Sequence, residues 1–532
     1  MSAALALTGT PPLLRTTMRH DGRLFAPWVV IVAVLSASSV LVYPWVFPTE
    51  ADRQALAAAI GSNPALGLIF GPANDLLTVD GFASWRSLAL GGFLVALGAI
   101  FAVTRATRGQ EDSGQAELLA SGVLGRSSRL MTAVGIGILG SLAAGVVAAI
   151  ATILCGGGVS DSLLLCATFA ATGFMFTGVA AVTAQLGVDA RTANSMAVGT
   201  LGVLFLLRGF AYSVDAPAWT IWINPLGWMT ETEPAFSNTW WPLLPTIAIV
   251  GLLLVVAFAL QARRDFGQGA IAPRPGPGRG AVRGTSRLAL ALNRGSLLTW
   301  TVAAIMIGSV FGRMATSVRD VLATNAAAQQ VLASGATSAD TLIPAFLVTI
   351  LSMIGIILAI PGVLTMLKVR SEETSDRVEP VLAGAVSRSR YYASNVVLAL
   401  LAPAVFVLVA GVIVAAQVSG ADLGLSFGQV LGQALAVIPA VWTIVALSVT
   451  VVGARPQAAL AAWVGVGASF GLTLLGPTFG LDDWVLGISP FWHVPTTTLP
   501  EPDYTGLVWI SLVTVGLLAI GFAGFRRRDL AR

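Results

Sequence analysis

Long apolar runs alternate with short polar segments along the whole chain. Most runs have roughly 18 to 25 residues, the length at which an α-helix crosses about 30 Å of hydrocarbon. Because polar residues are collected between the runs, the pattern predicts an all-α polytopic membrane protein with six spans in each half. The twelve predicted spans cover residues 26–47, 85–104, 130–154, 163–186, 192–211, 241–261, 297–314, 342–367, 391–418, 427–452, 457–475 and 504–525.

Two shorter segments lie outside the predicted spans. Residues 12–24 place Arg15, Arg19 and Arg23 four apart among apolar side chains, which predicts an amphipathic helix in the membrane interface before the first span. Residues 215–240 mix four tryptophans with prolines and acids, and Trp241 follows directly. Because tryptophan prefers the level of the lipid headgroups, this second segment is predicted to be interfacial or re-entrant.

A linker divides the chain into two halves. Residues 265–294 are rich in Gly, Pro and Arg and show no apolar period, so they are predicted to form a cytoplasmic linker with an interfacial segment. The first half, residues 1–264, and the second half, residues 295–532, are each predicted to hold six transmembrane helices.

Each half contains one charged segment, called an island here, and the two islands are similar in sequence. Residues 105–130 and 368–392 are the densest groups of charge between apolar runs, and a shift of 262 places (108 to 370) lays one on the other. The aligned pairs are Arg108 with Arg370, Glu111 with Glu373, Glu117 with Glu379, Gly122 with Gly384 and Arg126 with Arg388. The chain is therefore predicted to be two tandem six-helix repeats, and a matched pair of islands suggests a two-fold symmetric partner.

Composition and charge agree with this pattern. The 532 residues are 56% hydrophobic and 11% charged, with a mean hydropathy of +0.83. A net charge of +4 would suit a nucleic-acid-binding protein, but the arginines flank the predicted spans and form no separate basic patch. No nucleic-acid partner is therefore expected. Since basic residues favour the cytoplasmic side, both termini and both islands are predicted to be cytoplasmic.

The chain has few residues that could bind a metal, form a disulfide or bind a phosphate. With only two cysteines and two histidines, no zinc or haem site is expected. Cys155 and Cys166 are interpreted as small packing residues, with a disulfide as the alternative. The lone lysine, Lys368, follows no glycine-rich phosphate loop, so this chain is not expected to bind or hydrolyse ATP.

Three further features bear on the alternatives. An ion-coupled carrier usually holds acids or histidines at mid-membrane, and the predicted spans contain none there. Arg208 lies 17 residues after Arg191, about 25 Å along a helix, where it either reaches the outer headgroups or lines or gates a pathway. Residues 467–471, GASFG, match a hydrolase elbow but lie in an apolar run, where two glycines four apart are typical of a helix contact.

The islands resemble the first cytoplasmic loop of permease subunits of type 2 ABC exporters, which has the form E-x-x-x-G-x-x-E-L-L-x-x-P-x-S-R. The segments EDSGQAELLASGVLGR and EETSDRVEPVLAGAVSR carry its acids, apolar residues and closing arginine, with Gly122 and Gly384 in place of the usual proline. The fused twelve-span plan is similar to actinobacterial antibiotic, multidrug or polyketide exporter permeases. In that family the island is a coupling helix seated on an ATPase. The residues that inherit this role are Glu111, Glu117, Arg126, Glu373, Glu379 and Arg388.

The resemblance implies a permease without catalytic residues, metal or cofactor of its own, in the bacterial plasma membrane. Two copies of a separate ATPase would supply ATP and Mg, and the cargo would be a hydrophobic or amphiphilic compound taken from the cytoplasm or the inner leaflet. An ion-coupled secondary exporter is the first alternative. A lipid-modifying membrane enzyme is the second.

Overall fold

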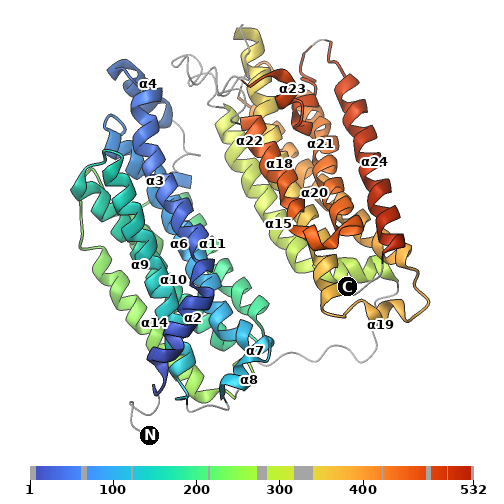
Figure 1. Ribbon diagram of the computed structural model, residues 1–532. Helices are drawn as coiled ribbons and strands as arrows, with labels where there is room; N and C mark the ends of the chain where they lie inside the picture. The colour runs from blue at the N-terminus through green and yellow to red at the C-terminus, as the bar shows by residue number, and fades with distance from the viewer. Residues whose placement is uncertain are drawn as a thin grey trace. The chain divides into compact units, whose positions relative to one another are not determined.

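The computed structural model describes residues 7–61, 69–120, 124–213, 216–265, 267–271, 284–316, 339–421, 423–474, 481–499 and 501–528. All regular elements in these ranges are helices. The chain divides into two compact units, residues 1–276 and 277–532, and each is a bundle of long helices (Figure 1).

Unit 1 is built around the helix α10. Its described elements are α2 (Thr10–Asp21), η1 (Gly22–Leu24), α3 (Ala26–Val46), α4 (Glu50–Gly61), α6 (Val79–Thr104), the π-helical turn η2 (Arg105–Gly109), α7 (Gln110–Asp112), α8 (Gln115–Ala120), α9 (Ser128–Leu154), α10 (Val159–Leu186), α11 (Ala190–Ser213), α12 (Ala218–Ile223), α13 (Pro225–Thr230) and α14 (Leu243–Arg263). Helix α10 packs against α6, α9, α11 and α14. Small residues allow this close approach: a Cβ atom at Gly91 of α6 would lie 2.5 Å from the Phe169 ring of α10.

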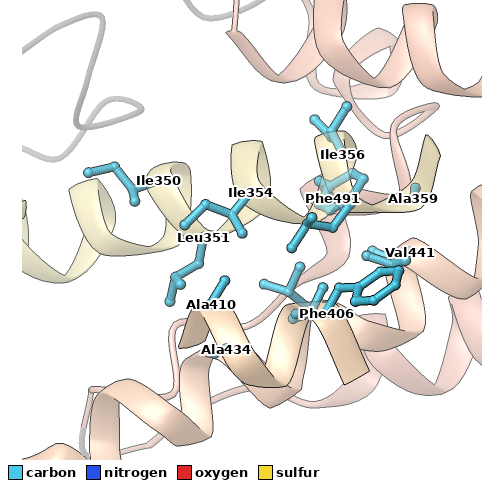
Figure 2. Packing of buried hydrophobic residues seen from close by; sticks show 14 of the residues in the cluster. Ile350, Leu351, Ile354, Ile356, Ala359, Phe406, Ala410, Ala434, Val441 and Phe491 are labelled. Atoms are coloured by element: carbon cyan, nitrogen blue, oxygen red, sulfur yellow. The ribbon is translucent and has the colours of Figure 1, made fainter. Parts of the chain in front are cut away.

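Unit 2 has a similar order of elements. They are α15 (Thr285–Thr316), α18 (Ala339–Thr374), α19 (Glu379–Leu382), α20 (Arg388–Ser419), α21 (Phe427–Ala454), η3 (Pro456–Ala461), α22 (Ala462–Leu474), α23 (Asp483–Leu486), η4 (Pro490–His493) and α24 (Thr505–Arg527). Figure 2 shows its core, where Ile354 of α18, Phe406 of α20 and Phe491 of η4 meet. Helix α18 has 36 residues and contains Pro344 and Pro361.

Eleven of the described helices are long and apolar enough to cross a membrane. They correspond to eleven of the predicted spans, and the polytopic all-helical class agrees with them. The span predicted at residues 457–475 differs, because the chain there forms the 3-10 helix η3, which begins at Pro456, before the 13-residue α22. The predicted count of twelve therefore stays a prediction. Helix α6 begins six residues earlier than expected, and α15 begins inside the predicted linker.

The shorter predicted segments are also helical. Helices α2 and η1 cover residues 10–24, and α2 packs along α9, where Leu14 lies against Gly135. The tryptophan-rich segment contains α12 and α13, and Trp222 stacks on Trp241 with centroids 4.8 Å apart. Both cysteines are free thiols. Cys166 is buried beside Phe169, which agrees with the packing interpretation.

Candidate functional site

The first island surrounds a buried arginine. It continues from α6 through η2, α7 and α8, at the end of unit 1 opposite α4 (Figure 1). The side chain of Arg108 is fully buried. Its Nε donates to the Ala184 carbonyl at 2.6 Å, its Nη2 to the Gln268 carbonyl at 2.9 Å, and its Nη1 to Glu111 at 2.9 Å. A buried guanidinium needs this many acceptors to offset its desolvation.

Glu111 joins the island to the end of the last helix of unit 1. Its side chain is only 6% exposed and lies 2.9 Å from Arg264 Nη2 and 3.4 Å from Arg129 Nη2, besides Arg108. Arg264 directly follows α14 and also donates from Nε to the Gln185 side chain of α10 at 2.6 Å. We call Arg108, Glu111, Arg129 and Arg264 the first clamp. It connects α6, α9, α10 and the end of α14 around one carboxylate.

Unit 2 has the same arrangement. The side chain of Glu373 is 1% exposed, and Arg528 Nη2 donates to its two oxygens at 2.7 and 2.8 Å. Arg370 Nη1 lies 3.5 Å from the same carboxylate. Arg528 directly follows α24, and its guanidinium lies over the Phe525 ring at 4.8 Å. We call Arg370, Glu373 and Arg528 the second clamp.

The two clamps differ in their arginines and in the hydrogen bonds that these make. Tyr391 stands in unit 2 where the sequence shift places Arg129, and its hydroxyl donates to Glu372 instead. Arg370 Nη1 and the Nε and Nη1 of Arg528 are buried without a hydrogen-bond partner in the described part of unit 2. The second clamp therefore holds its carboxylate with two arginines rather than three.

The closing arginines of the islands bind helix ends. Arg126 Nη2 donates to the carbonyls of Ala262, in the last turn of α14, at 3.1 Å and of Arg264, directly after that turn, at 3.3 Å. Arg388 Nη1 donates to the Arg528 carbonyl at 3.2 Å. The last carbonyls of a helix have no intrahelical partner and carry partial negative charge, so an arginine stabilises them.

Glu117 and Glu379 lie apart from the clamps. Each is exposed, on α8 and α19 respectively, and neither has an ion pair among the described residues. Leu118, next to Glu117, has 78% of its surface exposed. Of the two acids that are matched between the islands, one in each island is therefore buried and binds its own unit, and the other is exposed. Gly122, one of the predicted matched positions, lies outside the described residues.

Arg208 is buried rather than extended to the surface. It is 3% exposed, and its Nη2 donates to the Ile69 carbonyl at 2.7 Å. Its guanidinium lies over the Phe205 ring at 4.7 Å. The alternative in which Arg208 reaches the headgroups is wrong, because Ile69 and Thr230 of α13 cover this end of α11. Its role in a pathway stays a prediction.

Sequence reasoning missed Arg264 and Arg528. The signal was present, since RRDF at residues 263–266 and RRDL at residues 527–530 repeat between the halves. A repeat alone assigns no partner to either arginine, however. Among the described residues, no group of three or more His, Cys, Asp or Glu side chains could hold a metal ion.

Comparison with known proteins identifies the family. The family model described as multidrug efflux system permease Rv1217c, C-terminal domain, matches residues 50–260 and 282–526, which include both islands. The multidrug efflux system permease protein Rv1217c of Mycobacterium tuberculosis is 36% identical over 531 residues, which are 98% of this chain and 95% of that protein. The resemblance to multidrug exporter permeases is thus confirmed. This chain belongs to the family of the multidrug efflux system permease Rv1217c.

Proposed function

We propose that this chain is the permease subunit of an ATP-driven ABC exporter that extrudes hydrophobic or amphiphilic compounds, including drugs. The observation that carries the proposal is the clamp built twice around an island acid. Each unit encloses one glutamate between its island and the end of its last long helix. A force applied to an island would therefore reach the transmembrane helices through charge-assisted hydrogen bonds, which are stronger than neutral ones.

The outward-facing acids are the proposed contacts with the ATPase. Glu117 and Glu379 are exposed and have no ion pair in the described parts of their units, so their charges are available to basic groups of another protein. Arg126 and Arg388 bind the ends of α14 and α24 and would hold each island against the end of that helix. On this proposal, residues 105–130 and 368–392 are coupling segments.

The proposed assembly has one copy of this chain and two ATPase subunits, which bind ATP and Mg. Twelve spans in two tandem six-helix repeats would present two islands on one side of the bacterial plasma membrane. The parallel order of elements in the units and the parallel clamps support this arrangement. Because arginines are concentrated at the island side, we propose that both termini lie in the cytoplasm.

A cavity in unit 2 supports an amphiphilic cargo. It has a volume of about 150 Å³ and lies between α18, α22 and η4. Its lining combines the hydroxyls of Ser352 and Ser489 with the rings of Phe491 and Trp492. A cavity of about this size accepts a benzene-sized group. Uncharged rings with a few hydrogen-bonding groups fit this lining best.

Co-purification with the ATPase tests the function. The tagged permease, expressed with its ATPase, should yield a complex of one permease and two ATPase chains by native mass spectrometry. Export from vesicles should require internal ATP, and a transported drug should stimulate ATP turnover. Drug export driven by a proton or sodium gradient without ATP would support the ion-coupled alternative and refute the proposal.

A further inference from the structure

A second cavity lies at the island end of unit 1. Its volume is about 150 Å³, and it is enclosed by η1, α3, α6, η2 and α9. Apart from two charged residues, its lining is apolar, and the large side chains are Leu24, Phe25, Trp28, Phe101 and Ile136. Leu24 and Phe101 are 48% and 41% exposed, so the cavity opens at the surface of the bundle rather than inside it.

The packing of the aromatic rings that line this cavity depends on Gly98. The rings of Trp28 and Phe101 lie 6.0 Å apart, and Trp28 packs directly over Gly98. A Cβ atom at Gly98 would lie 2.8 Å from Trp28 and 3.2 Å from Phe25, closer than side chains normally approach. Any larger residue there would displace these rings. Residue 98 is thus a position where the backbone leaves room for the apolar site.

One edge of the cavity is charged. Asp21 Oδ1 lies 3.6 Å from Arg105 Nη2, and the Arg105 side chain keeps 59% of its surface exposed. Helices α2 and η1, which supply Asp21 and Leu24 to the lining, also carry three exposed arginines. These are Arg15, Arg19 and Arg23. Arg105 and Asp21 are the charged residues of the lining itself, and the exposed arginines of α2 and η1 add positive charge to the elements that supply it.

We infer that this cavity binds one anionic phospholipid, with an acyl segment between Phe25, Trp28 and Phe101 and the phosphate at Arg105. An apolar cavity of about 150 Å³ takes a benzene-sized group, so it holds a short segment of a chain rather than a whole one. Basic residues beside an amphipathic helix attract anionic headgroups. Asp21 holds the Arg105 guanidinium at the mouth while leaving most of it accessible to a phosphate.

The site would fix a lipid where the interfacial helix meets the first island. Arg105 begins the π-helical turn η2, and Arg108 of the first clamp lies one turn further on. Lipid binding is independent of the proposed transport function, because it needs neither the ATPase nor a drug. The two ideas can therefore fail separately.

Native mass spectrometry of the full-length, delipidated protein tests this inference. Titration with phosphatidylglycerol should give one tightly bound lipid, with phosphatidylcholine bound more weakly. Arg105→Gln should lower the affinity for phosphatidylglycerol about fivefold, as expected for one basic residue near an anionic headgroup. Ala102→Phe, which fills the cavity from its lining, should abolish the tight site.

Matched variants control for general effects. Gly251 of α14 is exposed, with no atom within 4 Å of an added Cβ, so Gly251→Phe adds the same ring outside the cavity. Arg287→Gln removes an exposed arginine of unit 2. Both should bind phosphatidylglycerol like the unmodified protein. Equal affinities for the two lipids, or an affinity in Arg105→Gln as high as in Arg287→Gln, would overturn the inference. Loss of drug binding in Ala102→Phe with lipid binding unchanged would assign the cavity to the cargo instead.

Discussion

Removing Arg528 should destabilise unit 2 much more than removing the arginine next to it. Arg528→Met deletes both hydrogen bonds to Glu373, whose side chain is 1% exposed, and leaves only Arg370 at 3.5 Å. Breaking a buried ion pair costs about 3–5 kcal/mol. Because Arg370 remains, we expect about 2–3 kcal/mol, a change of about 30- to 140-fold in the unfolding equilibrium.

The adjacent Arg527 supplies the control. It is exposed and has no ion pair among the described residues, so Arg527→Met should change the free energy of unfolding by less than about 0.5 kcal/mol. Both variants would be unfolded by denaturant titration in detergent and followed by far-UV circular dichroism. Drug-stimulated ATP turnover of each assembled complex would be measured in parallel. Arg528→Met should lose stimulation, and Arg527→Met should keep it.

A double variant separates the ion pair from other effects of Arg528. Replacing a buried pair by neutral groups of similar volume is often nearly neutral. Glu373→Gln combined with Arg528→Met should therefore be more stable than Arg528→Met alone by at least about 1 kcal/mol. If Arg528→Met is as harmless as Arg527→Met, or if the two substitutions are simply additive, the buried-clamp reasoning is wrong.

Three other outcomes are expected. The double variant Glu117→Ala, Glu379→Ala should insert normally but lose ATPase binding or drug-stimulated turnover, with each single variant intermediate; unchanged efflux and co-purification would show that these acids only solubilise the islands. Gly91→Ala should lower the free energy of unfolding by about 1–3 kcal/mol, because the added Cβ would overpack against Phe169. Gly199→Ala is the control: an added Cβ there meets nothing within 4 Å, so thermal unfolding should show no loss of stability. The chain purified without its ATPase should not hydrolyse ATP, and turnover that persists after removal of contaminants would contradict this.

The sequence predicted the island acids because charge is rare in this chain. Glu111 and Glu373 stand out between apolar runs and repeat at one spacing, so they could be selected without a structure. Their distant partners could not, since Arg264 lies 153 residues beyond Glu111. That pairing depends on where α14 ends in space. The apolar period of a sequence predicts a helix, but it does not predict how the helices pack and so which distant residues meet.

Two other differences have separate causes. The height of Arg208 along a helix gives its depth in the membrane but not the direction of its side chain. The direction depends on Ile69, from a polar segment with no apolar period. At residue 456 a proline begins a 3-10 turn, so an apolar run of suitable length contains a shorter α-helix than its hydropathy indicates.

The prolines of α18 make the two halves mechanically different. A straight helix of 36 residues would be about 54 Å long, well beyond the roughly 30 Å of hydrocarbon, and its island end carries Glu373. Pro361 interrupts the hydrogen-bond ladder about 20 Å from that end, at a point where helices kink. In unit 1, α6 contains no proline before its π-helical turn. A displacement of the first island would therefore pass through the π-helical turn into a helix without proline, whereas a displacement of the second would meet an interrupted hydrogen-bond ladder inside α18 itself.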